Sequence, residues 1–404
     1  MIGPSSRWRN LGVAAGAAAA ALFAAFDLYQ WALAQASDRF HNDFTFYYAA
    51  AKIGLEHGWP SIYDLKLQQA ALDALGSGIT VAELARYISP PPVAWAALPL
   101  TVLPFSDAYL AWSGLLVVAL VATWYLAAPP GGRARVIFLA AAVGWLPVIY
   151  GLQLGQPALF VALGVAGSYA LLQKGRPVWA GVALGALALK PQLAFLVPLA
   201  LLAARQNRAF LGSVLSLGAL AAASAVALGP GGVSAYLDRL DFASTVPVNR
   251  DLTLAFFLGD AARPAQIFIA AWTMLVAYRT RHRGIEWTYA LALAGGMLAT
   301  PYLHLDDLAM LGLAAWLVLR APAPGWTWAY VLALVIAVEG EPIWGPAPTL
   351  IGELGALALL SVPAFEHDHR AEKHHRAEGQ GDESLGRDGQ QLPEERQAVP
   401  TRRA

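Results

Sequence analysis

Long apolar runs separated by short polar turns make up most of the chain. Thirteen such runs fall at about 11–34, 91–104, 107–127, 134–150, 156–173, 177–190, 192–205, 209–229, 263–280, 285–300, 304–320, 326–340 and 348–365. A helix needs about 20 apolar residues to cross a bilayer upright, so several of these runs are short for a span. The pattern predicts an all-α polytopic membrane protein with no separate soluble core.

The positions of Lys and Arg predict which runs cross. These residues gather in short turns at Arg7/Arg9, Arg133/Arg135, Lys174/Arg176, Arg205/Arg208, 279–283 and Arg320. Short loops rich in Lys and Arg stay in the cytoplasm, which places both termini inside and residues 35–89 outside. One net crossing then remains between 90 and 132. We therefore expect 107–127 to span, 91–104 to be re-entrant or interfacial, and about twelve helices to cross in all. If 91–104 does cross, one later run must not.

Composition supports a membrane domain followed by a polar tail. Only 13% of residues are charged, against about 25% in soluble domains. Much of this charge lies in residues 366–404, which we expect to form a disordered cytoplasmic tail after a membrane domain at 1–365. The apolar run after MIGPSSRWRN favours a retained first helix over a cleaved signal peptide. Zero net charge gives no indication of nucleic-acid binding, and the absence of Cys excludes disulfides and thiolate chemistry.

The outer loop at 35–89 holds two short amphipathic patterns within residues 61–86, split by a GSG sequence. Helices lying along the outer membrane surface would have this pattern. A folded loop with ordinary packing is the alternative.

Asp43 follows the first run, within the sequence HNDFTFYYAA. In one interpretation the neighbouring rings form an aromatic belt at the membrane interface and Asp43 caps the next helix. In the other, partial desolvation among aromatic rings raises the pKa of Asp43 and makes it a general base. Local sequence leaves both open.

Lys190 stands alone between two apolar runs, in ALALKPQLAF. A cation at the membrane is costly and by default indicates a functional role, although a lysine can also extend to the interface. Because the topology places Lys190 on the outer face, where positive charge is not favoured, we expect it to bind phosphate.

The late sequence TPYLHLDDLAML brings His304, Asp306 and Asp307 together. The carboxylates can cap a helix, and His304 can donate to a phosphate oxygen. The H-x-D-D spacing matches no strong metal motif, so no metal site is predicted. Gln153, Gln156 and Arg86 are polar residues next to membrane segments. Their side chains are suited either to bind sugar hydroxyls or to cap helices.

Missing motifs narrow the function. A phosphate-binding P-loop is absent, which excludes an ATP-driven pump. A transporter or flippase for a lipid-linked saccharide stays open as an alternative. Such a protein would carry its ionisable groups near the membrane midplane, whereas an enzyme would hold them at one rim.

Several segments together resemble the bacterial glycosyltransferase family 87, over roughly residues 40–320. They are Asp43-Phe44 with Tyr47-Tyr48, SIYD at 61–64, YISPPPVAWAALPLTVLP at 87–104, the block from GLQLGQP to Lys190-Pro191, and TPYLHLDDLAML. The resemblance implies a fold of the GT-C type and a site on the periplasmic side of an inner membrane, and it implies no particular cofactor, with a divalent metal left open. It also implies a polyprenyl-phosphate-sugar donor, with mannose as the expected hexose, and a lipid or glycan acceptor.

The resemblance also implies residue roles. Asp43 would be the base that deprotonates the acceptor hydroxyl, and Lys190 and His304 would hold the donor phosphate. Sugar or acceptor contacts would come from Tyr47, Tyr48, Arg86, Gln153, Gln156, Asp306 and Asp307. Pro157 after Gly-Gln and the sequence YLHLDD depart from the common family pattern, and these departures affect the expected sugar and acceptor more than the reaction class.

Overall fold

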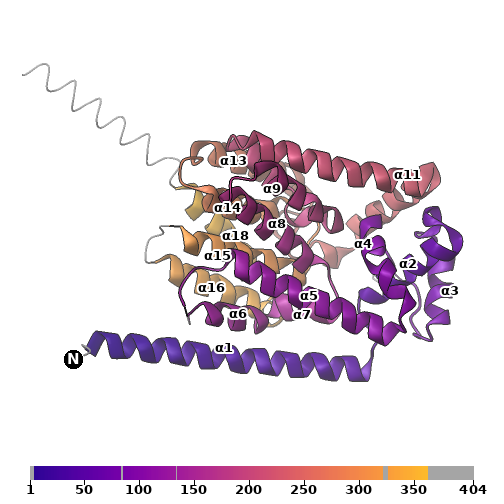
Figure 1. Cartoon of the computed structure of the whole chain (residues 1–404), viewed down its shortest axis with the longest axis horizontal. Helices are drawn as coiled ribbons and strands as arrows, with labels where there is room; N and C mark the ends of the chain where they lie inside the picture. Colours follow the sequence, from indigo (N-terminus) through magenta and orange to yellow (C-terminus); the bar gives the residue numbers. More distant parts are fainter. Residues whose placement is uncertain (1–3, 83–84, 133, 322–325, 363–404) are drawn as a thin grey trace, which may run out of the picture. The chain divides into compact units, whose positions relative to one another are not determined.

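A computed structural model describes residues 4–82, 85–132, 134–321 and 326–362. All regular secondary structure in these residues is helical (Figure 1), which confirms the all-α prediction. Residues Met1–Leu360 form one compact unit. The predicted tail at 366–404 lies outside the described residues.

The helices follow one another with short connections. The α-helices are α1 (Pro4–Ser37), α2 (Phe44–His57), α3 (Leu65–Ala74), α4 (Pro91–Ala97), α5 (Phe105–Ala127), α6 (Ala134–Val143), α7 (Leu146–Leu154), α8 (Ala158–Gln173), α9 (Pro177–Ala183), α10 (Leu196–Ala203), α11 (Asn207–Thr245), α12 (Ala255–Leu258), α13 (Ala262–Arg279), α14 (Ile285–Ala299), α15 (Ala309–Arg320), α16 (Thr327–Glu339), α17 (Glu341–Trp344) and α18 (Ala347–Ser361). The 3-10 helices are η1 (Trp59–Ser61), η2 (Leu98–Val102), η3 (Leu184–Leu189), η4 (Pro191–Leu193), η5 (Pro247–Asn249), η6 (Gly259–Ala261) and η7 (Leu305–Leu308).

Three helices of the described chain are long and apolar enough to cross a membrane: Ala14–Ser37 within α1, all of α5, and α11. Residues 135–143 and Leu146–Leu154 make a fourth candidate, bent by 56°. The helix α11 is itself broken at Gly229, whose φ of 61° and ψ of 177° are not helical. The expected span at 107–127 is therefore present as α5, while 91–104 forms only the short α4 and η2. These helices make the chain a membrane protein.

The helices α9 and α11 approach so closely that their backbones touch. A Cβ atom on Gly212 would lie 2.3 Å from the carbonyl oxygen of Val178, and one on Gly181 would lie 2.0 Å from the carbonyl oxygen of Ala209. Small residues permit such contacts between membrane helices. This crossing fixes α9 and the η3 segment that leads to Lys190.

Only the first of the two predicted amphipathic helices forms. Asp64 caps α3 by accepting from the backbone N–H of Lys66 and Leu67, at 2.8 and 3.1 Å, and α3 packs on α2 with Leu72 buried. Beyond the GSG turn, residues 79–82 are not helical, because the N–H of Val81 donates to Oε1 of Gln69 at 2.8 Å. The prediction of a second helix is wrong, and the described part of this loop packs against the domain.

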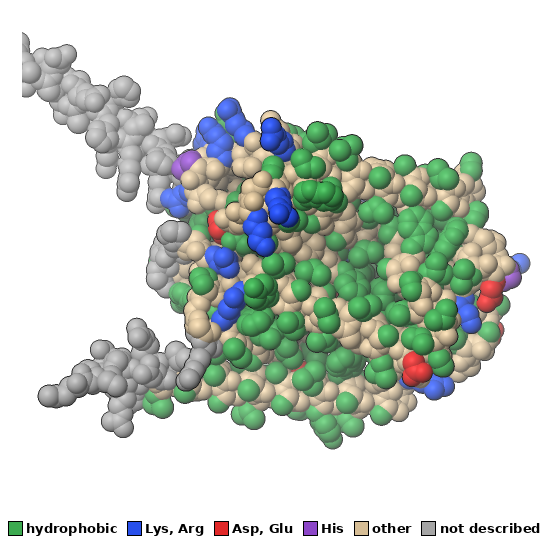
Figure 2. All heavy atoms as spheres, in the orientation of Figure 1, with side chains coloured by type: hydrophobic (Ala, Val, Ile, Leu, Met, Phe, Trp, Pro, Cys, Tyr) green, Lys and Arg blue, Asp and Glu red, His purple; other side chains and the backbone are tan. Residues whose placement is uncertain are grey.

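Basic side chains gather at one end of the unit Met1–Leu360. Figure 2 shows Lys and Arg over the turns that join α8 to α9, α10 to α11 and α13 to α14, whereas α2 and α3 lie at the opposite end (Figure 1). The guanidinium of Arg205 lies over the ring of Tyr278, 5.8 Å from the ring's centre, so two of the basic turns are adjacent.

Candidate functional site

Asp43 occupies the N-cap position of α2 but does not cap it. Its side chain makes no capping hydrogen bond, and the N–H of Thr45 instead donates to Oδ1 of Asn42 at 3.1 Å. The backbone N–H of Asp43 donates to the carbonyl oxygen of Leu154 at 2.9 Å, which ties the start of α2 to the end of α7. The capping interpretation is therefore wrong, and the carboxylate is directed elsewhere.

The aromatic residues after Asp43 are packed inside the protein. Phe44, Tyr47 and Tyr48 are each less than 5% exposed, and the rings of Phe44 and Trp112 lie 5.2 Å apart. An aromatic belt would face lipid headgroups, so that interpretation is also wrong. The rings instead fix α2 against α5 and hold Asp43 in place.

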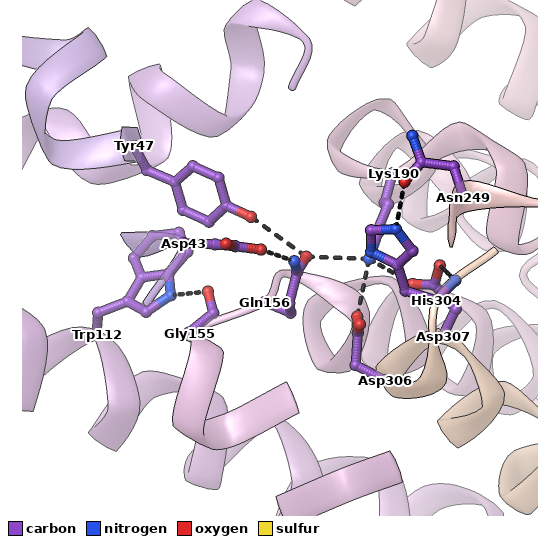
Figure 3. A network of polar contacts seen from close by, with 10 residues as sticks. All are labelled: Asp43, Tyr47, Trp112, Gly155, Gln156, Lys190, Asn249, His304, Asp306 and Asp307. Atoms are coloured by element: carbon purple, nitrogen blue, oxygen red, sulfur yellow. Dashed lines mark hydrogen bonds and ion pairs between the residues drawn. The ribbon is translucent and has the colours of Figure 1, made fainter. Parts of the chain in front are cut away.

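Gln156 reaches Asp43 from a tight turn. The helix α7 ends at Gly155, which has a left-handed φ of 70°, and Nε1 of Trp112 donates to the carbonyl oxygen of Gly155 at 2.7 Å. Glycine adopts this conformation without the steric cost of a side chain. The turn directs Gln156 inward, where its Nε2 donates to Oδ2 of Asp43 (Figure 3).

Lys190 lies at the break between η3 and η4. Pro191 follows it and disfavours helical backbone at the preceding residue, so Lys190 is extended with φ −153° and ψ 78°. Its ammonium donates to Oε1 of Gln156 at 3.0 Å and to Oδ2 of Asp306 at 2.8 Å, and it pairs with Asp307. One side chain, Gln156, thus bridges Asp43 and Lys190.

His304, Asp306 and Asp307 are held by the short helix η7. Oδ2 of Asp307 accepts from the backbone N–H of His304 at 2.9 Å. Nε2 of His304 lies 2.7 Å from Oδ1 of Asn249, and Nδ2 of Asn249 donates to the carbonyl oxygen of Ala243 at 2.7 Å. Because the Asn249 amide has its nitrogen committed, its oxygen accepts, and Nε2 of His304 carries a proton.

Burial and charge set the protonation of this network. Burial, followed by the negative charge of Asp306, raises the pKa of Asp43 to about 6. Burial alone would lower the pKa of Lys190, but Asp306 and Asp307 outweigh it and raise that pKa. Burial and Asp306 raise the pKa of Asp307, while burial lowers the pKa of His304. A charged Lys190, a neutral His304 and a carboxylate that titrates near neutral pH therefore lie together.

The other predicted contact residues divide into two groups. The hydroxyl of Tyr47 donates to Oε1 of Gln156 at 3.2 Å and so belongs to the network. The hydroxyl of Tyr48 donates to the carbonyl oxygen of Leu103 at 2.9 Å. Arg86 donates to the carbonyl oxygen of Ala82 and lies over the ring of Phe242. The hydroxyl of Tyr109 donates to the backbone carbonyl oxygen of Gln153, so this contact does not involve the Gln153 side chain.

Sequence reasoning missed Asn249 and Trp112. Asn249 lies in the outer loop VPVNRD, where a polar residue needs no special explanation, and Trp112 lies within an apolar span. Neither position showed a sequence pattern that indicates a functional residue. Among the described residues, no group of three or more His, Asp and Glu side chains is arranged to hold a metal ion.

The helices and the site together define an α-helical membrane protein with a buried carboxylate, amide and lysine network. A family model described as glycosyltransferase family 87 matches residues 87–338, more than half of the chain. The chain belongs to glycosyltransferase family 87 and is a glycosyltransferase. The matched range includes Gln156, Lys190 and His304 but begins after Asp43. Comparisons with curated proteins and with solved structures gave no match.

Proposed function

We propose that this enzyme transfers a hexose, with mannose as the expected sugar, from a polyprenyl-phosphate donor to a lipid or glycan acceptor. We place the reaction on the periplasmic face of a bacterial inner membrane, in a GT-C-type fold with about twelve crossings, both termini in the cytoplasm, and residues 1–365 as its membrane domain. Family membership supports the transfer of a sugar, and the apolar helices suit a lipid-linked donor.

The observation that carries the proposal is the partly exposed carboxylate of Asp43, one side chain away from the ammonium of Lys190. A base for the acceptor hydroxyl and a cation for the leaving phosphate must lie within the length of one sugar phosphate. Bridging by Gln156 meets that requirement.

The proposed reaction is a direct displacement. The Asp43 carboxylate takes the proton of the acceptor hydroxyl, and the hydroxyl oxygen forms a bond to the anomeric carbon of the sugar. The bond from that carbon to the phosphate oxygen breaks, and the polyprenyl phosphate leaves with the electron pair. Attack from the face opposite the phosphate inverts the anomeric configuration.

Phosphate binding at Lys190 requires an exchange of partners. An ammonium has three protons, and those of Lys190 are taken by Gln156, Asp306 and Asp307. We propose that a phosphate oxygen replaces Asp307, whose raised pKa makes it the carboxylate that most readily takes up a proton. His304 would lie on the same side of the phosphate.

The test is transfer by purified protein supplied with polyprenyl-phosphate-mannose and candidate acceptors. Asp43→Asn is expected to lower kcat by at least about 100-fold, the usual contribution of a general base. Asp73→Asn, which changes an exposed carboxylate on α3, is the matched control and should transfer at the wild-type rate. Undiminished transfer by Asp43→Asn would remove Asp43 from the role of base.

A further inference from the structure

Gln156 is the one residue that contacts both Asp43 and Lys190 in the network of Figure 3. Its Nε2 donates to Asp43, and its Oε1 accepts from Nζ of Lys190 at 3.0 Å and from the hydroxyl of Tyr47 at 3.2 Å. Gln156 is only 5% exposed. Such a residue is shielded from solvent and has its polar atoms satisfied by protein groups.

Chemistry fixes which way the Gln156 amide faces. Lysine has donors and no acceptor, whereas an ionised carboxylate has acceptors and no donor. If the amide were turned over, its NH2 group would face the ammonium and its oxygen would face the carboxylate. Both contacts would then be repulsive. Lys190 therefore holds the oxygen of Gln156, and this leaves the NH2 group directed at Asp43.

The orientation of Gln156 has a direct effect on Asp43. A donated N–H holds Oδ2, so the second oxygen, Oδ1, is the one left for a substrate hydroxyl; the described residues give it no hydrogen bond. A hydrogen bond to the charged form also favours ionisation, and the one from Gln156 lowers the pKa of Asp43 against the effect of burial.

Other titratable groups also face Asp43 from the elements packed around it. They are His41 before α2, Tyr47 on α2, Tyr150 on α7, Lys190 before η4, Tyr302 before η7, and Asp306 on η7. Of these, Lys190 and Asp306 carry opposite charges and contact each other. Among these neighbours, Gln156 is the side chain that donates a hydrogen bond to Asp43.

We propose that Gln156 is a positioning residue, which uses the charge of Lys190 to orient its amide and thereby keeps Asp43 ionised with one oxygen directed at the acceptor. The role as stated rests on the proposed function, because it assumes that Asp43 is the base. Gln156 acts through Asp43 and needs no contact with the reacting atoms.

The first test is the pH dependence of kcat/KM in Gln156→Met and Gln156→Glu. Methionine removes the donated N–H, and glutamate adds a negative charge beside Asp43, so both variants should move the acidic limb to higher pH, by about 1 pH unit or more for glutamate. Gln206→Glu is the matched control, because it makes the same chemical change in the turn between α10 and α11, with no contact to Asp43 in the described structure. Its acidic limb should stay at the wild-type pH. Reduced rates with unmoved limbs in both Gln156 variants would overturn the proposal.

A second measurement does not depend on transfer. Dicyclohexylcarbodiimide reacts with protonated carboxyl groups in apolar surroundings, so the pH at which labelling of Asp43 is half-maximal can be followed by mass spectrometry. This midpoint should rise in Gln156→Met relative to wild type. An unchanged midpoint would contradict the role of Gln156 even in a protein with no measurable transfer. Absence of transfer by wild type, with a shifted midpoint, would instead count against the proposed function alone.

Discussion

The side chain of Asn42, and not that of Asp43, caps α2. Oδ1 of Asn42 accepts the N–H of Thr45, so the carboxylate of Asp43 is available to Gln156. A carboxylate held in partly desolvated surroundings costs stability when it ionises. The position therefore has the features of a functional residue that the fold must accommodate.

This cost predicts the effect of Asp43→Asn on stability. The folded-state pKa of about 6 lies above the unfolded value of about 3.9, so the wild-type protein loses stability as pH rises from about 4 to 6. Asparagine has no such titration. Asp43→Asn should have a higher Tm than wild type at pH 8, with a smaller difference at pH 5, as measured by thermal unfolding in detergent. An equal difference at the two pH values would contradict the raised pKa.

Asp307 offers a prediction about donor binding. If phosphate replaces Asp307 at Lys190 and Asp307 takes up a proton, the donor KM should rise with pH above the pKa of Asp307, by at most tenfold per pH unit for one proton. Asp307→Asn should remove this dependence and lower the donor KM at pH 8. A donor KM that still rises with pH as in wild type would show that Asp307 does not exchange.

Single residues were predicted unevenly from the sequence. Lys190 stood out because a lone cation in an apolar stretch is costly, and Asp306 and Asp307 because they follow a proline-broken helix start. The sequence could not show that both aspartates contact Lys190, since they lie 116 and 117 residues further along the chain. From the sequence, the Gln156 side chain was suited either to cap a helix or to contact a sugar. Only the fold shows that it lies between two charged groups.

Among the elements, the end of α7 controls the geometry of the site. Gly155 brings Gln156 to Asp43, and a Cβ atom on Gly155 would lie 2.9 Å from Cβ of Phe44, the residue after Asp43. A side chain here would strain the turn and push against the start of α2. The position of Asp43 at the start of α2 therefore depends on the conformation of the Gly155 turn.

Gly155→Ala should lower both stability and transfer. Alanine in a left-handed conformation costs about 1–2 kcal/mol, and the contact with Phe44 adds to this cost. Gly175→Ala is the matched control, because Gly175 has a φ of 67° but no atom within 4 Å of an added Cβ. We expect both variants to lose a few degrees in Tm, and only Gly155→Ala to lose at least about tenfold in kcat/KM. Equal kcat/KM for the two variants would contradict this dependence.

The sequence predicted helix boundaries correctly where the composition changes. It missed them where tertiary contacts determine the backbone conformation. Proline and glycine bounded α5 and α8 in the sequence as in the structure. The second amphipathic pattern at 79–86 failed because Gln69 binds the backbone of Val81, a contact that hydrophobic periodicity does not record. The long α11 likewise contains a break at Gly229 within what the sequence presents as one apolar run followed by a loop.

On the scale of the molecule, charge separates two ends. The basic turns that join α8 to α9, α10 to α11 and α13 to α14 lie at one end, and α2 with α3 lies at the other. Positive charge resists translocation, so the proposed site and the basic turns should face opposite sides of the membrane.

The absence of Cys makes this orientation directly testable. Glu56→Cys, at the exposed end of α2, and Lys174→Cys, in the exposed turn after α8, each introduce one thiol. A membrane-impermeant maleimide applied to intact spheroplasts should label the first and not the second, while both should react after the membrane is opened. Labelling of Lys174→Cys in intact spheroplasts would reverse the proposed topology.

The long sequence separations within the network also have a consequence for biosynthesis. Asp43 leaves the ribosome 113 residues before Gln156, and Lys190 leaves it 116 residues before Asp306. Until η7 has been made, Lys190 has no carboxylate partner from that helix, and an unpaired cation near the membrane is unfavourable. The segments that carry the network must therefore stay rearrangeable until the last quarter of the chain arrives, and a nascent chain stopped before Asp306 would be a substrate for quality-control proteolysis.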